Sequence, residues 1–478
     1  MRKTVENPIR KTLNKTQPVL HISLHILLYT LMFFIFTSST QAKKLEYQDK
    51  QPLHDIQRQI SAARIEQDIR KLVSFGTRHT LSETESDVRG IGAARRWIKS
   101  EFDSISAACG GCLKVYFQSR TIQGEKRIPD ATEVVSVIAI QTGSTDPNRY
   151  VMMSGDIDSR ISDIMNFNDD SPGANDNASG VAGTLEAARV LSQYKFNGSI
   201  VFAALAGEEQ GLFGGKILAE TAKEEGWRLK AVLNNDMIGN ISGINGVINN
   251  TTARIFAEGT RYTETDAEAR NRRYTGGEVD SPSRNLARYI DLMADRYIPN
   301  LDTMVVYRLD RFGRGGHHRP FNDLGYPGVR IMETNEHYER QHQDLRITDG
   351  VTYGDTIDGV NFDYAAKLTS LNAVSLAGMA WAPSPPAKVT IQGAVQPSTT
   401  LSWAALHKRQ NEQLAGYKIY WRYTDAPQWQ YSKFVGDVTK YTLENVVIDN
   451  YFFGVASVSQ AGFESPVVFP GAAGAFGE

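Results

Sequence analysis

The sequence predicts an α/β fold over residues 43–382, with a mostly parallel central sheet flanked by helices. A small all-β sandwich of immunoglobulin type is expected to follow over 389–478. Two observations carry this prediction. Up to residue 382, apolar segments of strand length alternate with helical stretches. Beyond the proline-rich segment 383–388, which we interpret as a linker, the pattern changes to short, aromatic-rich strands.

The strands of the first region are apolar and nearly continuous, as expected where both faces of a sheet are covered. We expect them at 133–140, 150–155, 199–206, 229–235 and 328–332. Between the second and third strands, Val181, Leu185, Ala188 and Leu191 recur at three- and four-residue spacing. This spacing predicts a helix over 180–194.

The C-terminal strands are expected at 400–403, 416–422, 441–443 and 451–458. The order of Trp403, the strand with Tyr417 and Tyr420, Leu443 and Tyr451 resembles a fibronectin type III module. The resemblance implies a spacer or a unit that binds an extracellular partner or surface, and no chemistry.

Charge argues against nucleic acid as a partner. The chain has 52 basic and 54 acidic residues, and without residues 1–42 it has 47 and 53, a net charge of −6. A nucleic-acid-binding protein needs a basic face for the phosphate backbone. The chain has 478 residues, of which 41% are hydrophobic, and a chain of this length and composition can bury a large core.

The N-terminus predicts export. Basic residues precede an apolar run over 26–36, and small and polar residues follow up to Ala42. This order is typical of a signal peptide over 1–42, which would deliver the protein to the periplasm or the exterior. The alternative is an uncleaved membrane anchor, although about 20 apolar residues are needed to span a bilayer. In an oxidising compartment Cys109 and Cys112 are expected to form a local disulfide; free thiols and a metal or redox site are the alternatives.

Acidic residues gather where the predicted strands end, and open parallel sheets build their sites at that edge. They are Asp156, Asp158, Asp176, Glu208, Glu209 and Asp236. His317, His318, His337 and His342 lie within one later stretch. Taken singly, these residues could be a helix cap, a solvated turn or a surface patch. Together they predict two divalent metal ions, because such a concentration of negative charge requires cations.

Five motifs over 54–382 resemble the co-catalytic di-zinc exopeptidase superfamily of bacterial leucyl aminopeptidase, glutamate carboxypeptidase and glutaminyl cyclase. They are Asp-Ile-Asp-Ser at 156–159, Gly-Ala-Asn-Asp-Asn-Ala-Ser-Gly at 173–180, Gly-Glu-Glu-Gln-Gly-Leu-Phe-Gly at 207–214, Asn-Asp-Met at 235–237 and Tyr-Glu-Arg-Gln-His-Gln-Asp at 338–344. The resemblance implies that 43–382 is a zinc exopeptidase catalytic domain.

The resemblance also implies a role for each site residue. Asp176 would bridge two ions, Asp156 and Asp236 would complete one ion site, and Glu209 and His342 would complete the other. Glu208 would be the general base that takes a proton from a water bridging the metals. Asp158 would orient the ligand beside it.

Two positions depart from the family pattern. Asp156 stands where the family usually has His, and His317-His318 stand where it usually has Asp-His. The two changes are reciprocal, so we expect a swapped His–carboxylate interaction or a rebuilt ligand shell. Four carboxylate ligands would neutralise two divalent ions, which predicts an altered metal preference or pH optimum.

The function that follows is an exported zinc-dependent exopeptidase, an aminopeptidase that hydrolyses the N-terminal bonds of peptides or proteins. The alternatives are a carboxypeptidase or glutaminyl cyclase of the same superfamily, and a binding protein with a degenerate metal site.

Overall fold

The computed structural model describes residues 49–406 and 413–477. The predicted signal peptide lies outside these residues. Within them, no helix is long and apolar enough to cross a membrane.

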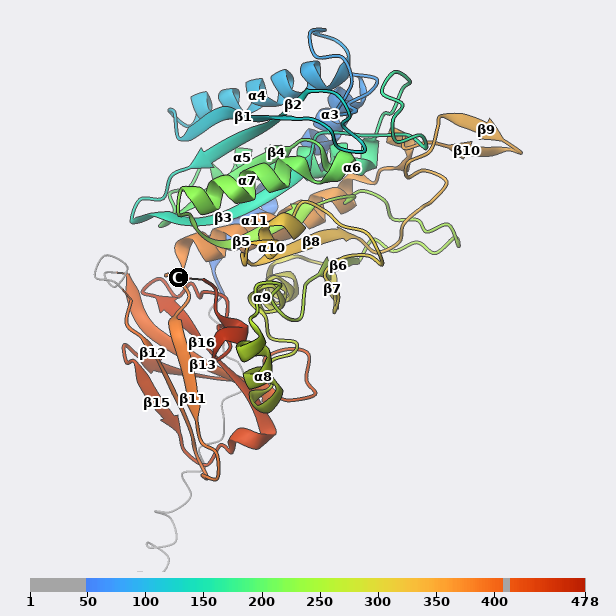
Figure 1. Cartoon of the computed structure of the whole chain (residues 1–478). Coiled ribbons are helices and arrows are strands. Elements are labelled where there is room, and N and C mark those ends of the chain that lie inside the picture. The colour runs from blue at the N-terminus through green and yellow to red at the C-terminus, as the bar shows by residue number, and fades with distance from the viewer. Residues whose placement is uncertain (1–48, 407–412, 478) are drawn as a thin grey trace, which may run out of the picture. The chain divides into compact units, whose positions relative to one another are not determined.

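An eight-stranded mixed sheet forms the centre of the catalytic region (Figure 1). Its order is β1-β2-β4-β3-β5-β8-β6-β7. The central strands β4, β3, β5 and β8 run parallel, whereas β1 and β2 are antiparallel at one edge and β6 is antiparallel to β8. The strands are β1 Leu113–Ile122, β2 Thr132–Gln141, β3 Asp146–Asp156, β4 Gly198–Leu205, β5 Arg228–Asn235, β6 Thr252–Phe256, β7 Asp302–Val306 and β8 Gly328–Glu333.

Helices cover both faces of this sheet, so its strands are apolar on both sides. In β4, Ile200, Phe202 and Ala204 pack with the larger layer of helices, and the alternate residues Val201 and Ala203 pack with α7 and α10. The helices are α2 Gln51–Gln59, α3 Ala62–Val73, α4 Gly90–Ala108, α5 Gly180–Leu191, α6 Glu208–Gly211, α7 Phe213–Glu224, α8 Asp266–Thr275, α9 Pro282–Tyr297, α10 Arg319–Asp323 and α11 Phe362–Trp381. The predicted α/β fold is confirmed.

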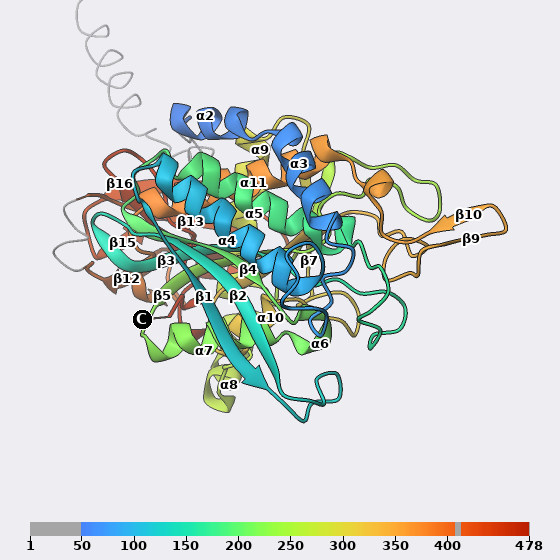
Figure 2. The same cartoon turned by 90° about the horizontal axis from the view of Figure 1, so that it is seen from above.

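Two small features lie outside these layers. The Cys109–Cys112 disulfide closes the turn between α4 and β1, as predicted. The strands β9 Arg346–Thr348 and β10 Val351–Tyr353 form a hairpin that projects from the domain (Figures 1 and 2).

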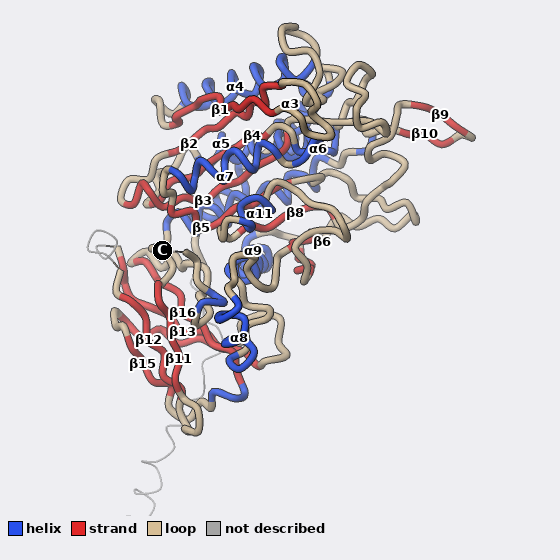
Figure 3. The backbone as a smooth tube through the Cα atoms, viewed as in Figure 1, coloured by secondary structure: helices blue, strands red, loops and turns tan. Residues whose placement is uncertain are grey.

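The C-terminal region holds two three-stranded antiparallel sheets, shown as strands in Figure 3. One has the order β11-β12-β15 and the other β14-β13-β16. Trp403, Tyr417, Leu443 and Phe453 lie in the core between them. The strands are β11 Ala387–Gln392, β12 Thr399–Ala404, β13 Leu414–Tyr423, β14 Tyr431–Gly436, β15 Lys440–Leu443 and β16 Tyr451–Ser459. The predicted β module is therefore present, while its kinship with fibronectin type III stays a prediction.

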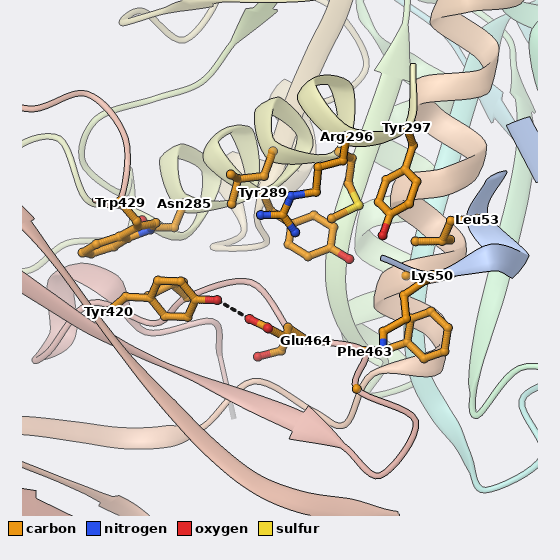
Figure 4. A pocket seen from close by; sticks show the side chains of 16 residues that line it. Lys50, Leu53, Asn285, Tyr289, Arg296, Tyr297, Tyr420, Trp429, Phe463 and Glu464 are labelled. Atoms are coloured by element: carbon orange, nitrogen blue, oxygen red, sulfur yellow. Dashed lines mark hydrogen bonds between the residues drawn. The ribbon is translucent and has the colours of Figure 1, made fainter. Parts of the chain in front are cut away.

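The β module packs against the catalytic region through polar and aromatic contacts. Ser457 of β16 donates hydrogen bonds to the carbonyls of Pro383 and Ser384, which holds the proline-rich segment in place. Figure 4 shows a pocket between α9 and this module, in which the Tyr420 hydroxyl donates to Glu464.

Candidate metal centre

The predicted site residues lie at one edge of the sheet, because β3, β4 and β5 run parallel and end there. Asp156 is the last residue of β3, and Asp236 directly follows β5. Glu208 is the first residue of α6, which begins after β4 and Gly207. Gly207 has a φ of 73°, a conformation that suits glycine and turns the chain sharply into α6.

Asp176, Glu209 and His342 form one compact ligand set. His342 Nε2 lies 2.9 Å from Asp176 Oδ2 and 2.8 Å from Glu209 Oε1. The three ligand atoms lie within 4.8 Å of one another, which fits one divalent cation. Imidazole nitrogen and carboxylate oxygen are ligands that zinc accepts.

Two buried carboxylates hold the backbone of this ligand set. Asp158 accepts hydrogen bonds from the backbone N–H groups of Glu208 and Glu209, at 3.1 and 2.9 Å. Asp355 does the same for Asn175 and Asp176, with its closest contact to Asp176 at 2.6 Å. Asp158 therefore fixes the backbone at the start of α6, and its role in orienting a metal ligand stays a prediction.

The ionisable groups of the ligand set shift one another's pKa values. Burial alone acts to raise the pKa of Asp176, but the hydrogen bond and positive charge of His342 lower it below its ordinary value. Burial acts to lower the pKa of His342, but Glu209 and Asp176 raise it to about 9. A metal ion entering the set must therefore displace a proton from His342.

Glu208 differs from its neighbour Glu209. Its side chain is half-buried, and its carboxylate makes no hydrogen bond within the part of the chain that the structure describes. Burial, followed by the nearby charge of Glu209 and Asp236, raises its pKa well above the ordinary value. A carboxylate with a raised pKa and free oxygens can accept and return a proton near neutral pH.

The other expected ligand set, Asp156 and Asp236 with Asp176, is not assembled. Asp156 contacts His317 Nδ1 at 2.5 Å and accepts a hydrogen bond from Asn177 Nδ2 at 2.7 Å. Asp236 Oδ2 lies 2.7 Å from the guanidinium of Arg330. Among the described residues, only the first set brings three ligand atoms within 4.8 Å. In this arrangement Asp156 and Asp236 therefore contact other side chains and form no set of three ligand atoms with Asp176.

Comparison with known proteins decides the family. Residues 136–355 match the model of peptidase family M28. A "Probable zinc metalloprotease" of Pyrenophora teres f. teres is 41% identical over 415 residues, which cover 86% of this chain and 85% of that protein. Another from Leptosphaeria maculans is 41% identical over 413 residues, covering 86% of this chain and 95% of that protein. The chain belongs to peptidase family M28.

The chain is therefore a metallopeptidase, as the sequence predicted. Its fold is also that of a solved structure, the LapA aminopeptidase of Legionella pneumophila, with a TM-score of 0.51 and 21% sequence identity. The superposition covers 71% of this chain and 78% of LapA.

The two adjacent histidines of this M28 peptidase have different surroundings. His317 faces Asp156, so the two reciprocal departures from the family pattern meet in space as a His–carboxylate pair. His318 Nε2 contacts the carbonyl of Leu309 at 2.9 Å and lies 3.6 Å from Asp310, away from the ligand set. Burial lowers the pKa of both histidines to about 4, so both are neutral at pH 7.

Three residues that contact the site were not predicted from the sequence. Arg160 donates to Glu209 Oε2 at 2.7 Å, and its other nitrogen lies 2.6 Å from His342 Nδ1. Asp355 holds the Asp176 backbone, and Arg330 contacts Asp236. Of these three, only Arg330 stands out in the sequence, because it is a charged residue inside the apolar strand predicted at 328–332.

Proposed function

We propose that this M28 peptidase is a zinc-dependent aminopeptidase that releases residues from the N-terminus of peptides. The observation that carries the proposal is the pairing of the Asp176–Glu209–His342 ligand set with an adjacent carboxylate, Glu208, that makes no hydrogen bond among the described residues. This arrangement separates the metal ligand from the proton-transfer group. The zinc in the names of the fungal relatives supports the choice of metal.

The chain's own residues perform distinct steps in this mechanism. Asp176, Glu209 and His342 would hold a zinc ion, which would supply Lewis acidity to a peptide carbonyl and to a nearby water. Glu208 takes a proton from the attacking water and passes it to the leaving amine. Asp158 fixes the backbone at the start of α6. It thereby positions Glu208 for proton transfer and Glu209 for metal binding.

Selectivity for an N-terminus follows from charge and access. Carboxylates dominate this edge of the sheet and attract a substrate ammonium group. A small polar pocket opens beside Asp176 and is lined by side chains that include Asn240, Glu333 and Arg340. The limited space of this pocket, which lies beside the ligand set, favours a chain terminus over the middle of a long peptide.

The single ligand set favours a second candidate, a glutaminyl cyclase, which requires one metal ion. Purified protein should be assayed on three substrates: an aminoacyl amide with a chromogenic leaving group, a peptide with a free C-terminus, and a peptide with N-terminal glutamine. We expect turnover of the first, loss of turnover with chelator, and loss of turnover in Glu208→Gln. Cyclisation without release of an N-terminal residue would establish the cyclase instead, and absence of any turnover would favour a binding protein.

Export is part of the proposal and rests on the order of residues in 1–42. Mass analysis of the protein from its native cells should give a mature chain that begins at Lys43. An intact N-terminus would contradict cleavage. Binding of an extracellular partner by the β module stays a prediction.

A further inference from the structure

Arg330 lies at the centre of β8 with none of its side chain exposed. The parallel register pairs Arg330 with Asn234 of β5, two residues before Asp236. The strand pairing therefore brings a guanidinium group to the same sheet edge as the acidic residues. A buried guanidinium stays charged, and it is costly to bury unless carboxylates surround it.

Two carboxylates and one carbonyl surround Arg330. Its guanidinium lies 2.7 Å from Asp236 Oδ2 and 3.3 Å from both oxygens of Asp310, and it donates a hydrogen bond to the carbonyl of Gly315 at 2.9 Å. Asp310 in turn has Arg311 as a further partner. Asp236 has no other ion pair among the described residues, so Arg330 is its counter-ion.

Asp156, the other residue expected to complete a second ion site, is engaged as well. One oxygen contacts His317 Nδ1, and the other accepts a hydrogen bond from Asn177. Asp156, His317 and Asn177 are all buried, and neither Asp156 nor His317 joins the Asp176–Glu209–His342 set.

We infer that Arg330 is a fixed cation that takes the place of a second metal ion, so that this M28 peptidase binds one divalent ion per chain. The inference deepens the proposed function and rests on it, since it concerns the ion that the reaction requires. A second dication at Asp236 would bind the same carboxylate as the guanidinium, and the two positive charges would repel each other strongly in a buried site.

Counting zinc in the wild-type protein tests this directly. The purified chain is stripped with a chelator, loaded with excess Zn²⁺, freed of unbound metal by gel filtration, and measured by elemental analysis and native mass spectrometry. We expect one zinc per chain, held by Asp176, Glu209 and His342. Two zinc ions per chain would overturn the inference.

Variants separate the two acidic positions. Asp236→Asn should still bind one zinc, with a dissociation constant within about threefold of the wild-type value. The reason is that Asp236 forms an ion pair with Arg330 and does not bind the ion. Asp176→Asn should lose the zinc, which checks that the assay reports the ligand set. A loss of zinc in Asp236→Asn like that in Asp176→Asn would overturn the inference.

Arg330→Met tests the role of the guanidinium itself. Removal of the fixed charge should allow a second zinc to bind at concentrations that saturate the wild type at one. A count that stays at one in folded Arg330→Met would refute the role of Arg330. If this variant does not fold, the wild-type count and Asp236→Asn still decide the matter.

The zinc count is separable from the proposed activity. It needs no substrate, so failure of the aminopeptidase assay leaves the count unchanged. Conversely, aminopeptidase activity with two bound zinc ions would sustain the proposed function and overturn the role of Arg330.

Discussion

Asp280 joins the catalytic region to the β module and offers a sharp test of what holds them together. Its carboxylate is completely buried just before α9. It accepts hydrogen bonds from Arg422 of β13 through both oxygens at 2.9 Å, and from Arg288 of α9 at 2.8 Å. Replacement by asparagine keeps the shape but leaves two buried guanidinium groups without a counter-ion.

The expected loss of stability follows from the burial of all three groups. Arg288 and Arg422 are 2% and 1% exposed, so water cannot compensate for the lost charge. Removing one partner of a buried ion pair costs about 3–5 kcal/mol. Unfolding entropy is about 2.1 cal/mol/K per residue, or roughly 0.9 kcal/mol/K for the unit Lys44–Glu478, so Asp280→Asn should lower Tm by about 3–6 °C.

Differential scanning calorimetry of wild type and Asp280→Asn measures this shift. Asp449→Asn is the matched control, because the same change is made on the exposed surface of the β module and should cost less than about 0.5 kcal/mol. Adding Arg422→Met to Asp280→Asn should recover part of the loss by removing one unpaired charge. A Tm for Asp280→Asn equal to that of Asp449→Asn would show that the buried ion pairs of Asp280 do not stabilise the protein.

Three further predictions concern the site and the core. Glu208→Gln should lower kcat by about 10²–10⁴-fold while zinc content stays unchanged, as measured by steady-state kinetics and elemental analysis; a parallel loss of zinc would make Glu208 a ligand instead. Asp355→Asn should weaken zinc binding by about 10–100-fold in a chelator competition, because Asp355 holds the backbone of Asp176, whereas the exposed control Asp358→Asn should not. Burial lowers the pKa of Lys230 to about 8. The unfolded state therefore binds more protons between about pH 8 and 10.5, and stability should rise with pH across that window by about 3 kcal/mol. Urea denaturation should show this rise in wild type and not in Lys230→Met; equal profiles would exclude Lys230 as its cause.

Most of the parallel centre of the sheet could be predicted, because strands buried on both faces are continuously apolar. The strands near the edges of the sheet were harder to predict from the sequence. In β1 only Leu113 is buried and the other residues are half-buried or exposed, and β6 and β7 are only five residues long. Their pairing with long-range partners stabilises them more than their own composition does.

The acidic residues at the strand ends, the paired glutamates at 208 and 209, and the family resemblance of these motifs could all be recognised from the sequence. Each is local in the chain, so residue type and spacing were sufficient evidence. The partners of Asp156 and Asp236 were decided only by tertiary structure. His317 and Arg330 lie 161 and 94 residues away from them along the chain. Strand register brings Arg330 to Asp236, and the segment just before α10 brings His317 to Asp156. Because a charge acts through space and not along the sequence, only the folded chain shows which acidic residues remain available for a metal ion.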